Sequence, residues 1–148
     1  MKILITGGCG FVGSNVALKL DQEHEVFCLD NLSKSESKLN EKLLQKRDIQ
    51  VVKGNISDKK FVEDLIEDLK PDCLIHLAAQ VAMTNSIEDP QNDFDINLVG
   101  TFNLINAINN FSKQTKFINI STNKVYGDLV WDKICLLYTS DAADDVRG

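Results

Sequence analysis

The residues of this chain best suited to hold a ligand are a set of glycines near its N-terminus and one acidic residue that follows them. Gly8, Gly10 and Gly13 fit the spacing G-x-G-x-x-G, and Gly7 with the last two fits the wider G-x-x-G-x-x-G. A turn without Cβ atoms lets backbone N–H groups approach a pyrophosphate, and the N-terminus of a following helix attracts that anion. Asp30 ends the next apolar run, where its carboxylate can accept hydrogen bonds from a ribose diol.

The elements around these residues have the order of a dinucleotide-binding βαβ unit. An apolar run over 1–6 precedes the glycines, a helical pattern begins at Ser14, and a second apolar run over 26–29 leads to Asp30. A carboxylate at this place would repel the 2′-phosphate of NADP, so the sequence predicts NAD as the cofactor. Two alternatives stay open, namely an ordinary glycine turn and a solvated acid at a strand end.

The rest of the chain continues the alternation of strand and helix patterns. Short apolar runs predict strands over 1–6, 26–29, 49–52, 73–77 and 117–120. Helical spacing predicts helices over 14–20 and 39–46, from an N-cap at Ser57 to Pro71, and over 98–108, with 31–37 as a loop. This alternation predicts an α/β fold, a doubly wound parallel sheet of the Rossmann type that binds ligands beyond the carboxyl ends of its strands.

In two of the predicted helices, apolar residues recur with helical spacing. In the helix over 39–46, these inward positions are Leu39, Leu43 and Leu44. In the helix over 98–108, the apolar positions are Leu98, Phe102, Ile105 and Ile108, and the polar residues between them are Asn103, Asn106 and Asn109.

Composition places the chain among soluble, single-domain globular proteins. Of its 148 residues, 43% are hydrophobic and 26% are charged. It has no run of about 18 apolar residues and no secretion signal, so we expect a cytoplasmic protein without a membrane partner. The net charge of −6, without a Lys/Arg cluster, argues against a nucleic-acid partner. Cys9, Cys28, Cys73 and Cys135 lack metal-ligand spacing, so we expect reduced thiols and no metal site.

Segments at the predicted strand ends, and one at the start of a helix, resemble those of a known family. They are Thr6–Gly13, Asp30–Ser33, His76–Gln80, Asn97–Thr101 and Ser121–Gly127. Their order and spacing resemble the extended short-chain dehydrogenases that act as NAD-dependent nucleotide-sugar epimerases and dehydratases. The resemblance covers about residues 1 to 130. Residues 80–87, 93–97 and 121–128 carry a narrower likeness to the CDP-paratose 2-epimerase branch of that family.

The resemblance implies which residues would bind NAD. The implied positions run from the pyrophosphate turn through the adenosine ribose and the adenine to the nicotinamide half: Gly7, Gly10, Phe11, Val12, Gly13, Asp30, Asn31, Ser33, Asn55, Ile56, Leu77, Ala78, Ala79, Gln80, Asn97 and Ser121. Asn55 stands where the family usually has Asp, so the contact to adenine loses a charge and gains a donor. Thr122 matches the catalytic Ser or Thr whose hydroxyl binds the sugar oxygen that is oxidised.

Structural alternatives exist for three of the polar residues in these segments. Asn97 could be a polar residue at a helix bend, and Thr122 could be a turn residue without chemistry. His76 lies in an apolar run, where a hydrogen-bonded core histidine is a better interpretation than a base or a ligand. We expect Lys124 and Tyr126 to form part of a turn rather than a catalytic pair, because they are too close together and in the wrong order.

The family's Tyr-x-x-x-Lys base motif does not occur in this sequence. The two tyrosines, Tyr126 and Tyr138, are followed four residues later by Val130 and Ala142. In the family that motif comes some tens of residues after the segment equivalent to 121–127. We therefore expect residues 1–133 to form a truncated NAD-binding Rossmann domain. Residues 134–148 are expected to be an artefactual or disordered tail, and the alternative is a genuine short homologue with an unusual tail.

The resulting functional prediction is an NAD-dependent nucleotide-sugar epimerase represented by its cofactor half, with a CDP-hexose as substrate. One alternative is a 4,6-dehydratase or C4 epimerase of the same family. An alternative of another class is a non-catalytic NAD-binding module. By analogy with the family, whose members often dimerise through helices of this half, a homodimer is also expected.

Overall fold

Five short apolar runs form the strands of one parallel sheet in the computed structural model, which describes residues 1–122. The strands are β1 Lys2–Thr6, β2 Glu25–Asp30, β3 Gln50–Lys53, β4 Cys73–His76 and β5 Lys116–Asn119. Their order is β3-β2-β1-β4-β5, and each neighbouring pair is parallel. The order reverses between β1 and β4, which places a topological switch point at their carboxyl ends. The predicted fold class is confirmed, and each strand end lies within one residue of its predicted position.

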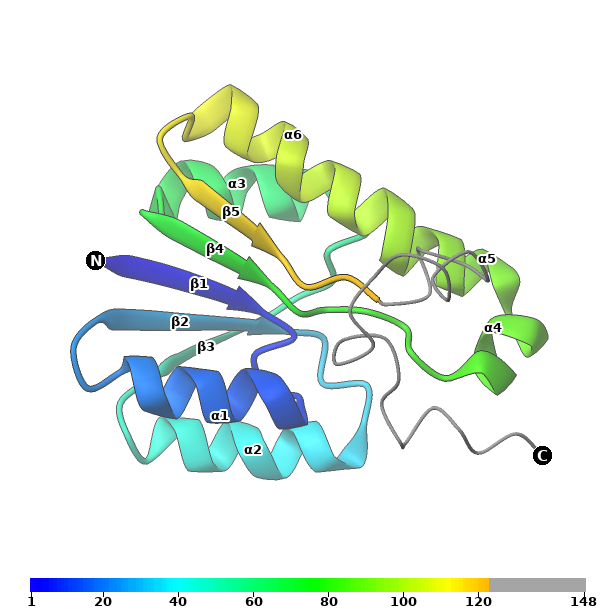
Figure 1. Cartoon of the computed structure of the whole chain (residues 1–148), viewed down its shortest axis with the longest axis horizontal. Coiled ribbons are helices and arrows are strands. Elements are labelled where there is room, and N and C mark those ends of the chain that lie inside the picture. Colours follow the sequence, from blue (N-terminus) through cyan, green and yellow to red (C-terminus); the bar gives the residue numbers. More distant parts are fainter. Residues whose placement is uncertain (123–148) are drawn as a thin grey trace, which may run out of the picture.

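Helices cover both faces of this sheet, as the crossover connections of parallel strands require. They are α1 Phe11–Leu20, α2 Ser35–Gln45, α3 Lys59–Leu69, α4 Met83–Glu88, α5 Pro90–Phe94, the π-helix η1 Asp95–Gly100, and α6 Thr101–Phe111. Figure 1 shows α1 and α2 on one face of the sheet and α3 and α6 on the other, with α4 and α5 beyond the carboxyl ends of the strands. No helix within residues 1–122 is long and apolar enough to span a bilayer.

The core consists of two apolar clusters, one on each face of the sheet. Ile3 and Ile5 of β1 pack with Ala17 of α1 and Leu44 of α2 on one face. Leu4 of the same strand points to the other face, where the cluster includes residues of α3 and α6. Because successive side chains of a strand alternate between faces, the near-continuous apolar run of β1 serves both layers at once.

The prediction for the second helix was wrong in its start and in two of its inward positions. Helix α2 begins at Ser35, within the segment expected to be a loop, and Leu39 and Leu43 are exposed while Leu44 is buried. The buried positions of α2 are Ser37 and Leu44, which are two helical turns apart and therefore lie on one stripe. Only this stripe meets the core, because α2 lies at the margin of the sheet beside α1 (Figure 1).

The predictions for the two later helices also need correction. The N-cap of α3 is Asp58 rather than Ser57, because the Asp58 side chain accepts a hydrogen bond from the Phe61 amide at 3.1 Å. In the segment over 98–108, the apolar positions Leu98, Phe102 and Ile105 are exposed. Ile108 is buried, as its apolar position predicts, and the other buried residues of α6 are Asn103, Leu104 and Ala107. The π-helical turn η1 precedes α6, so a continuous 3.6-residue period does not describe this segment.

Candidate dinucleotide site

A cleft of about 470 Å³ opens at the carboxyl ends of the strands, around the switch point between β1 and β4. The cleft is lined by every predicted cofactor-binding residue except Asn97: Gly7, Gly10, Phe11, Val12, Gly13, Asp30, Asn31, Ser33, Asn55, Ile56, Leu77, Ala78, Ala79, Gln80 and Ser121. The predicted catalytic residue Thr122 is not part of this lining; it is exposed and follows Ser121 in the segment after β5.

Sequence reasoning missed several residues that also line the cleft. They are Leu29, Lys34, Ser37, Gly54, Ile96 and Ile120, while Val81, which was expected at the site as part of the segment after the strand over 73–77, also lines the cleft. Leu29 and Ile120 are the last residues of predicted strands and Gly54 follows another such strand by two residues, so a wider window at each strand end would have found all three. Ile96 lies in the π-helix η1, far in sequence from a strand end, and only the fold brings it to the cleft.

The turn after β1 brings the N-terminus of α1 close to the ends of β1 and β4. Gly7 has a left-handed backbone with φ +68°, and a Cβ atom there would lie 2.8 Å from the Ala78 nitrogen. A Cβ atom on Gly13 would overlap the carbonyl oxygen of Gly7. Both positions therefore need glycine, and the turn is tightened by the hydrogen bond from Gly10 N to Gly7 O at 2.9 Å.

The N-terminus of α1 has the features of an anion site. The amides of an α-helix's first turn have no intrahelical partner, so those of residues 11–13 are available to an anion at the cleft. No acidic residue occurs in this first turn to compete with that anion. The glycines, the first turn and the lined cleft together fit the pyrophosphate of a dinucleotide.

Asp30 holds the glycine turn at the end of β2. Its two carboxylate oxygens accept hydrogen bonds from Cys9 N at 3.0 Å and from Leu32 N at 2.9 Å. On the other side of the turn, the Asn40 side chain of α2 donates to the Cys9 carbonyl oxygen at 2.9 Å. A carboxylate oxygen can accept more than one hydrogen bond, so Asp30 keeps capacity for the hydroxyls of a ribose.

The two cysteines beside the turn are poor nucleophiles. Cys9 and Cys28 are fully buried. Burial, together with the negative charge of Asp30, raises the pKa of Cys9 to about 12, and burial also raises the pKa of Cys28 to about 12. Since the thiolate is the reactive form, neither thiol is suited to covalent chemistry at neutral pH. Both are free thiols that pack in the apolar cluster on the α1 and α2 face of the sheet.

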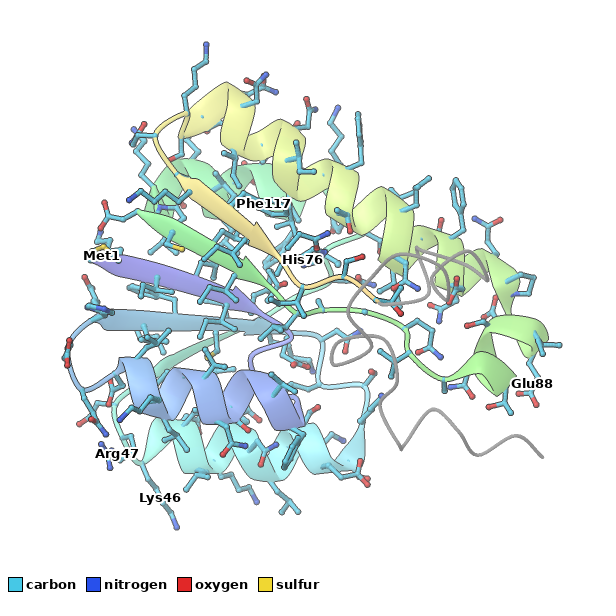
Figure 2. All side chains as sticks on the ribbon, in the orientation of Figure 1. Met1, Lys46, Arg47, His76, Glu88 and Phe117 are labelled. Carbon is cyan, nitrogen blue, oxygen red and sulfur yellow. The ribbon has the colours of Figure 1, made fainter. Side chains whose placement is uncertain are left out.

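His76 connects β1 to helix α6 through hydrogen bonds on both of its ring nitrogens. Nδ1 lies 2.7 Å from Thr6 Oγ1, and Nε2 lies 2.9 Å from Thr101 Oγ1. Thr101 donates its one hydroxyl proton to the Asn97 carbonyl oxygen at 2.8 Å, so it must accept from Nε2–H. Nδ1 of the neutral ring then accepts from Thr6. Burial favours this neutral form by lowering the pKa of His76 to about 4. This geometry supports the interpretation as a hydrogen-bonded core histidine. Its ring also lies beside that of Phe117, with 5.9 Å between the ring centroids and 35° between the planes (Figure 2).

Asn97 fixes the segment that lines the cleft after β4, although it does not line the cleft itself. Its Oδ1 accepts from Gln80 N at 2.8 Å and its Nδ2 donates to Gln80 O at 3.0 Å. The same Nδ2 donates to Asp93 Oδ1, which also accepts from the Ser86 hydroxyl at 2.7 Å. These contacts place Asn97 as a support for Gln80, with α4 and α5 held by the same network.

The sequence and the structure of this chain were compared with those of known proteins, and both comparisons found relatives. The family model described as GDP-mannose 4,6 dehydratase matches residues 4–134. The CDP-paratose 2-epimerase of Salmonella typhi is 47% identical over 131 residues, which are 87% of this chain and 39% of that protein. The chain thus spans about two fifths of the length of this relative.

Two solved structures are similar to the fold described above. The UDP-Glc/GlcNAc 4-epimerase from Campylobacter jejuni matches with a TM-score of 0.76 and 35% identity, over 86% of this chain and 39% of that chain. The UDP-glucose 4-epimerase of Thermus thermophilus, in complex with NAD, matches with a TM-score of 0.71 and 33% identity, over 83% of this chain and 38% of that chain.

Proposed function

The chain belongs to the GDP-mannose 4,6 dehydratase family of NAD-dependent epimerases and dehydratases, and from that premise we propose that it is the NAD-binding part of a nucleotide-sugar epimerase. One observation carries this proposal. The same glycine turn leads into the first turn of α1 and donates a hydrogen bond to Asp30. Gly7 and Gly13 allow the close approach there, and Asp30 accepts from the turn itself. A dinucleotide needs this combination of an anion site next to a diol acceptor.

Different residues of the cleft would bind different parts of the cofactor. The glycine turn and the amides of the first turn of α1 would hold the pyrophosphate, and Asp30 with Asn31 and Ser33 would hold the adenosine ribose. Asn55 and Ile56 would contact the adenine, and the segment Leu77–Gln80, which Asn97 fixes, would lie against the nicotinamide half. NAD supplies a reversible hydride acceptor in this family of reactions. The chain's own residues bind and orient that acceptor.

For the substrate, we propose a CDP-hexose oxidised at C2. The 47% identity to the CDP-paratose 2-epimerase of Salmonella typhi supports this choice. The Thr122 hydroxyl would bind the sugar oxygen that is oxidised. The alternative dehydratase would need acidic residues beside Thr122 for the elimination of water, and this sequence has Asn123 and Lys124 there. The proton acceptor would be a Tyr-x-x-x-Lys motif, which this sequence does not contain, so the chain itself should bind NAD without turnover.

Calorimetric titration of the 148-residue chain with NAD and NADH tests the proposal. We expect a saturable signal with both forms, because the pyrophosphate and the adenosine half are common to them. A folded preparation that gives no heat or fluorescence change with millimolar cofactor would refute the assignment. Measurable epimerase turnover by this chain would show that the assignment of the base is wrong.

The rival of another class, a non-catalytic NAD-binding module, shares the same cleft and would also bind NAD. The codons that follow in the natural gene distinguish the two. A tyrosine and a lysine four residues apart would favour the epimerase, because this spacing puts both on one helix face. A stop codon would favour the module.

A further inference from the structure

Asn103 is a buried polar residue that ties helix α6 to the loop following β3. The residue is 5% exposed. Nδ2 donates to the carbonyl oxygen of Ile56 at 3.0 Å and to that of Ser57 at 3.1 Å. A side-chain amide has two N–H donors, so one group satisfies two consecutive carbonyls from a distant segment of the chain. Losing these donors would leave both carbonyls without this partner in a place largely shielded from water.

The loop that Asn103 holds is the one that lines the adenine end of the cleft. Gly54, Asn55 and Ile56 all line the cleft. The loop is tied to the ribose side as well, because Gly54 N donates to the Asp30 carbonyl oxygen at 3.1 Å. Asn55 is also held locally, since its Oδ1 accepts from Ser57 N at 3.1 Å. The position of Asn55 therefore depends on β2 at one end and on α6 at the other.

Gly100 provides a second, independent contact between the same part of the chain and the same loop. A Cβ atom at Gly100 would lie 2.5 Å from both Cδ1 and Cγ1 of Ile56. Ile56 itself is 4% exposed and belongs to the core cluster with Leu104 of α6. The loop is thus contacted by a hydrogen-bonding side chain of α6, Asn103, and by the close approach of Gly100 at the end of η1.

We infer that Asn103 is a positioning residue for the adenine end of the cofactor, acting through the carbonyls of Ile56 and Ser57. This inference rests on the proposed function, because the adenosine half of NAD is the ligand that the loop would meet. Asn97 fixes Gln80 at the other end of the cleft. One short helical stretch, residues 97–103, therefore holds the segments that line both ends of the cleft.

The substitution Asn103→Asp tests this role, because it keeps the side-chain shape and replaces the two N–H donors by an oxygen facing two carbonyl oxygens. Its matched control is Asn109→Asp, the same change at an exposed position of α6. We expect Asn103→Asp to weaken the binding of NAD and of ADP-ribose by about tenfold, equivalent to about 1.4 kcal/mol, relative to the control. Inorganic pyrophosphate, which would meet only the glycine turn, should bind both variants equally.

Amide hydrogen exchange gives a readout that does not depend on NAD binding. Exchange at residues 55–58 should be faster in Asn103→Asp than in Asn109→Asp. If the parent chain fails to bind NAD, the proposed function is wrong. If amide exchange at residues 55–58 is the same in Asn103→Asp and Asn109→Asp, the role of Asn103 is wrong, whatever the result for NAD. A folded Asn103→Asp variant with control-like NAD affinity would also overturn it.

If Asn103→Asp does not fold, Asn103→Leu decides the question, because it removes the two N–H donors to Ile56 and Ser57 without placing a charge against their carbonyls. We expect Asn103→Leu to weaken NAD and ADP-ribose binding while leaving pyrophosphate binding unchanged. A folded Asn103→Leu variant with parental affinity for all three ligands would overturn the inference.

Discussion

Asp30 joins two functions in one carboxylate, since it accepts hydrogen bonds from the glycine turn and faces the proposed ribose position. We predict that Asp30→Asn narrows the preference for NAD over NADP by about tenfold, or about 1.4 kcal/mol. The physical reason is that the neutral amide no longer repels a 2′-phosphate. The ratio of the two dissociation constants, measured by calorimetry, checks this prediction. Asp68→Asn is the matched control, because it removes the same charge from an exposed position of α3. An Asp30→Asn ratio equal to that of the control would contradict the ribose role.

His76 makes the stability of the fold depend on pH. Burial lowers its pKa to about 4, from 6.5 for a free histidine. Between these values the unfolded chain binds a proton that the folded chain does not, so the free energy of unfolding falls as the pH decreases through this window. The loss due to this group is at most about 3 kcal/mol.

The variant His76→Gln should remove that component of the pH dependence while keeping an N–H donor near Thr101. Urea unfolding at pH 7 and pH 5 measures it as the difference between parent and variant. His24→Gln, at the chain's other histidine, serves as the control. If the free energy of unfolding changed equally with pH in the parent and in His76→Gln, the protonation of His76 would not contribute to the pH dependence of stability.

The residues that could be predicted from sequence are those that directly follow a strand. Strand ends are visible as apolar runs, and parallel strands bring their carboxyl ends to one edge, so Asp30 and Leu77 could be assigned to one cleft. The hydrogen bonds of Asn97 to Gln80 and of Asn103 to Ile56 could not be predicted. They join segments far apart in the chain, and their donors sit on helix positions whose facing depends on tertiary packing.

At the scale of elements, the start of α3 shows how two neighbouring polar residues divide their tasks. Asp58 caps the helix through the Phe61 amide, while the amide of Ser57 belongs to the preceding turn with Asn55. We predict that Asp58→Ala lowers the free energy of unfolding by about 1 kcal/mol, the usual cost of losing an N-cap side chain. Ser57→Ala should cost much less. Urea denaturation of both variants tests the pair, and a larger loss for Ser57→Ala would reverse the assignment.

In helix α6, the spacing of apolar residues alone did not predict which residues are buried. Both Asn103 and Ile108 are buried, whereas Phe102 and Ile105 are exposed. A pattern count treats asparagine as a surface residue, but a buried asparagine is stable where its donors are satisfied, as those of Asn103 are by two carbonyls. The existence of this helix was predictable, because its period is close to 3.6 residues. Its orientation was decided by the partners of Asn103 and by the π-turn before it.

At the scale of the whole molecule, the described residues form a five-stranded sheet with an apolar cluster on each of its faces. The predicted tail, residues 134–148, lies outside the described residues. We predict that deleting 134–148 leaves the melting temperature nearly unchanged, because the described residues 1–122 already form an apolar cluster on each face of the sheet. Differential scanning calorimetry of the two chains checks this. A large decrease would show that the tail contributes to the fold.

The exposed apolar side chains of η1 and α6 bear on the expected homodimer. Leu98, Phe102 and Ile105 are 58%, 64% and 49% exposed. A second copy of the chain, the partner that the family resemblance implies, would remove them from water. We therefore predict that Phe102→Ser weakens self-association of the 148-residue chain by at least about tenfold, since aromatic residues at the centre of an interface carry much of its binding energy. Leu39→Ser is the control, because Leu39 is 68% exposed on α2, on the other face of the sheet. Sedimentation equilibrium measures both constants, and a parent chain that stays monomeric at high concentration would rule out a homodimer through this helix.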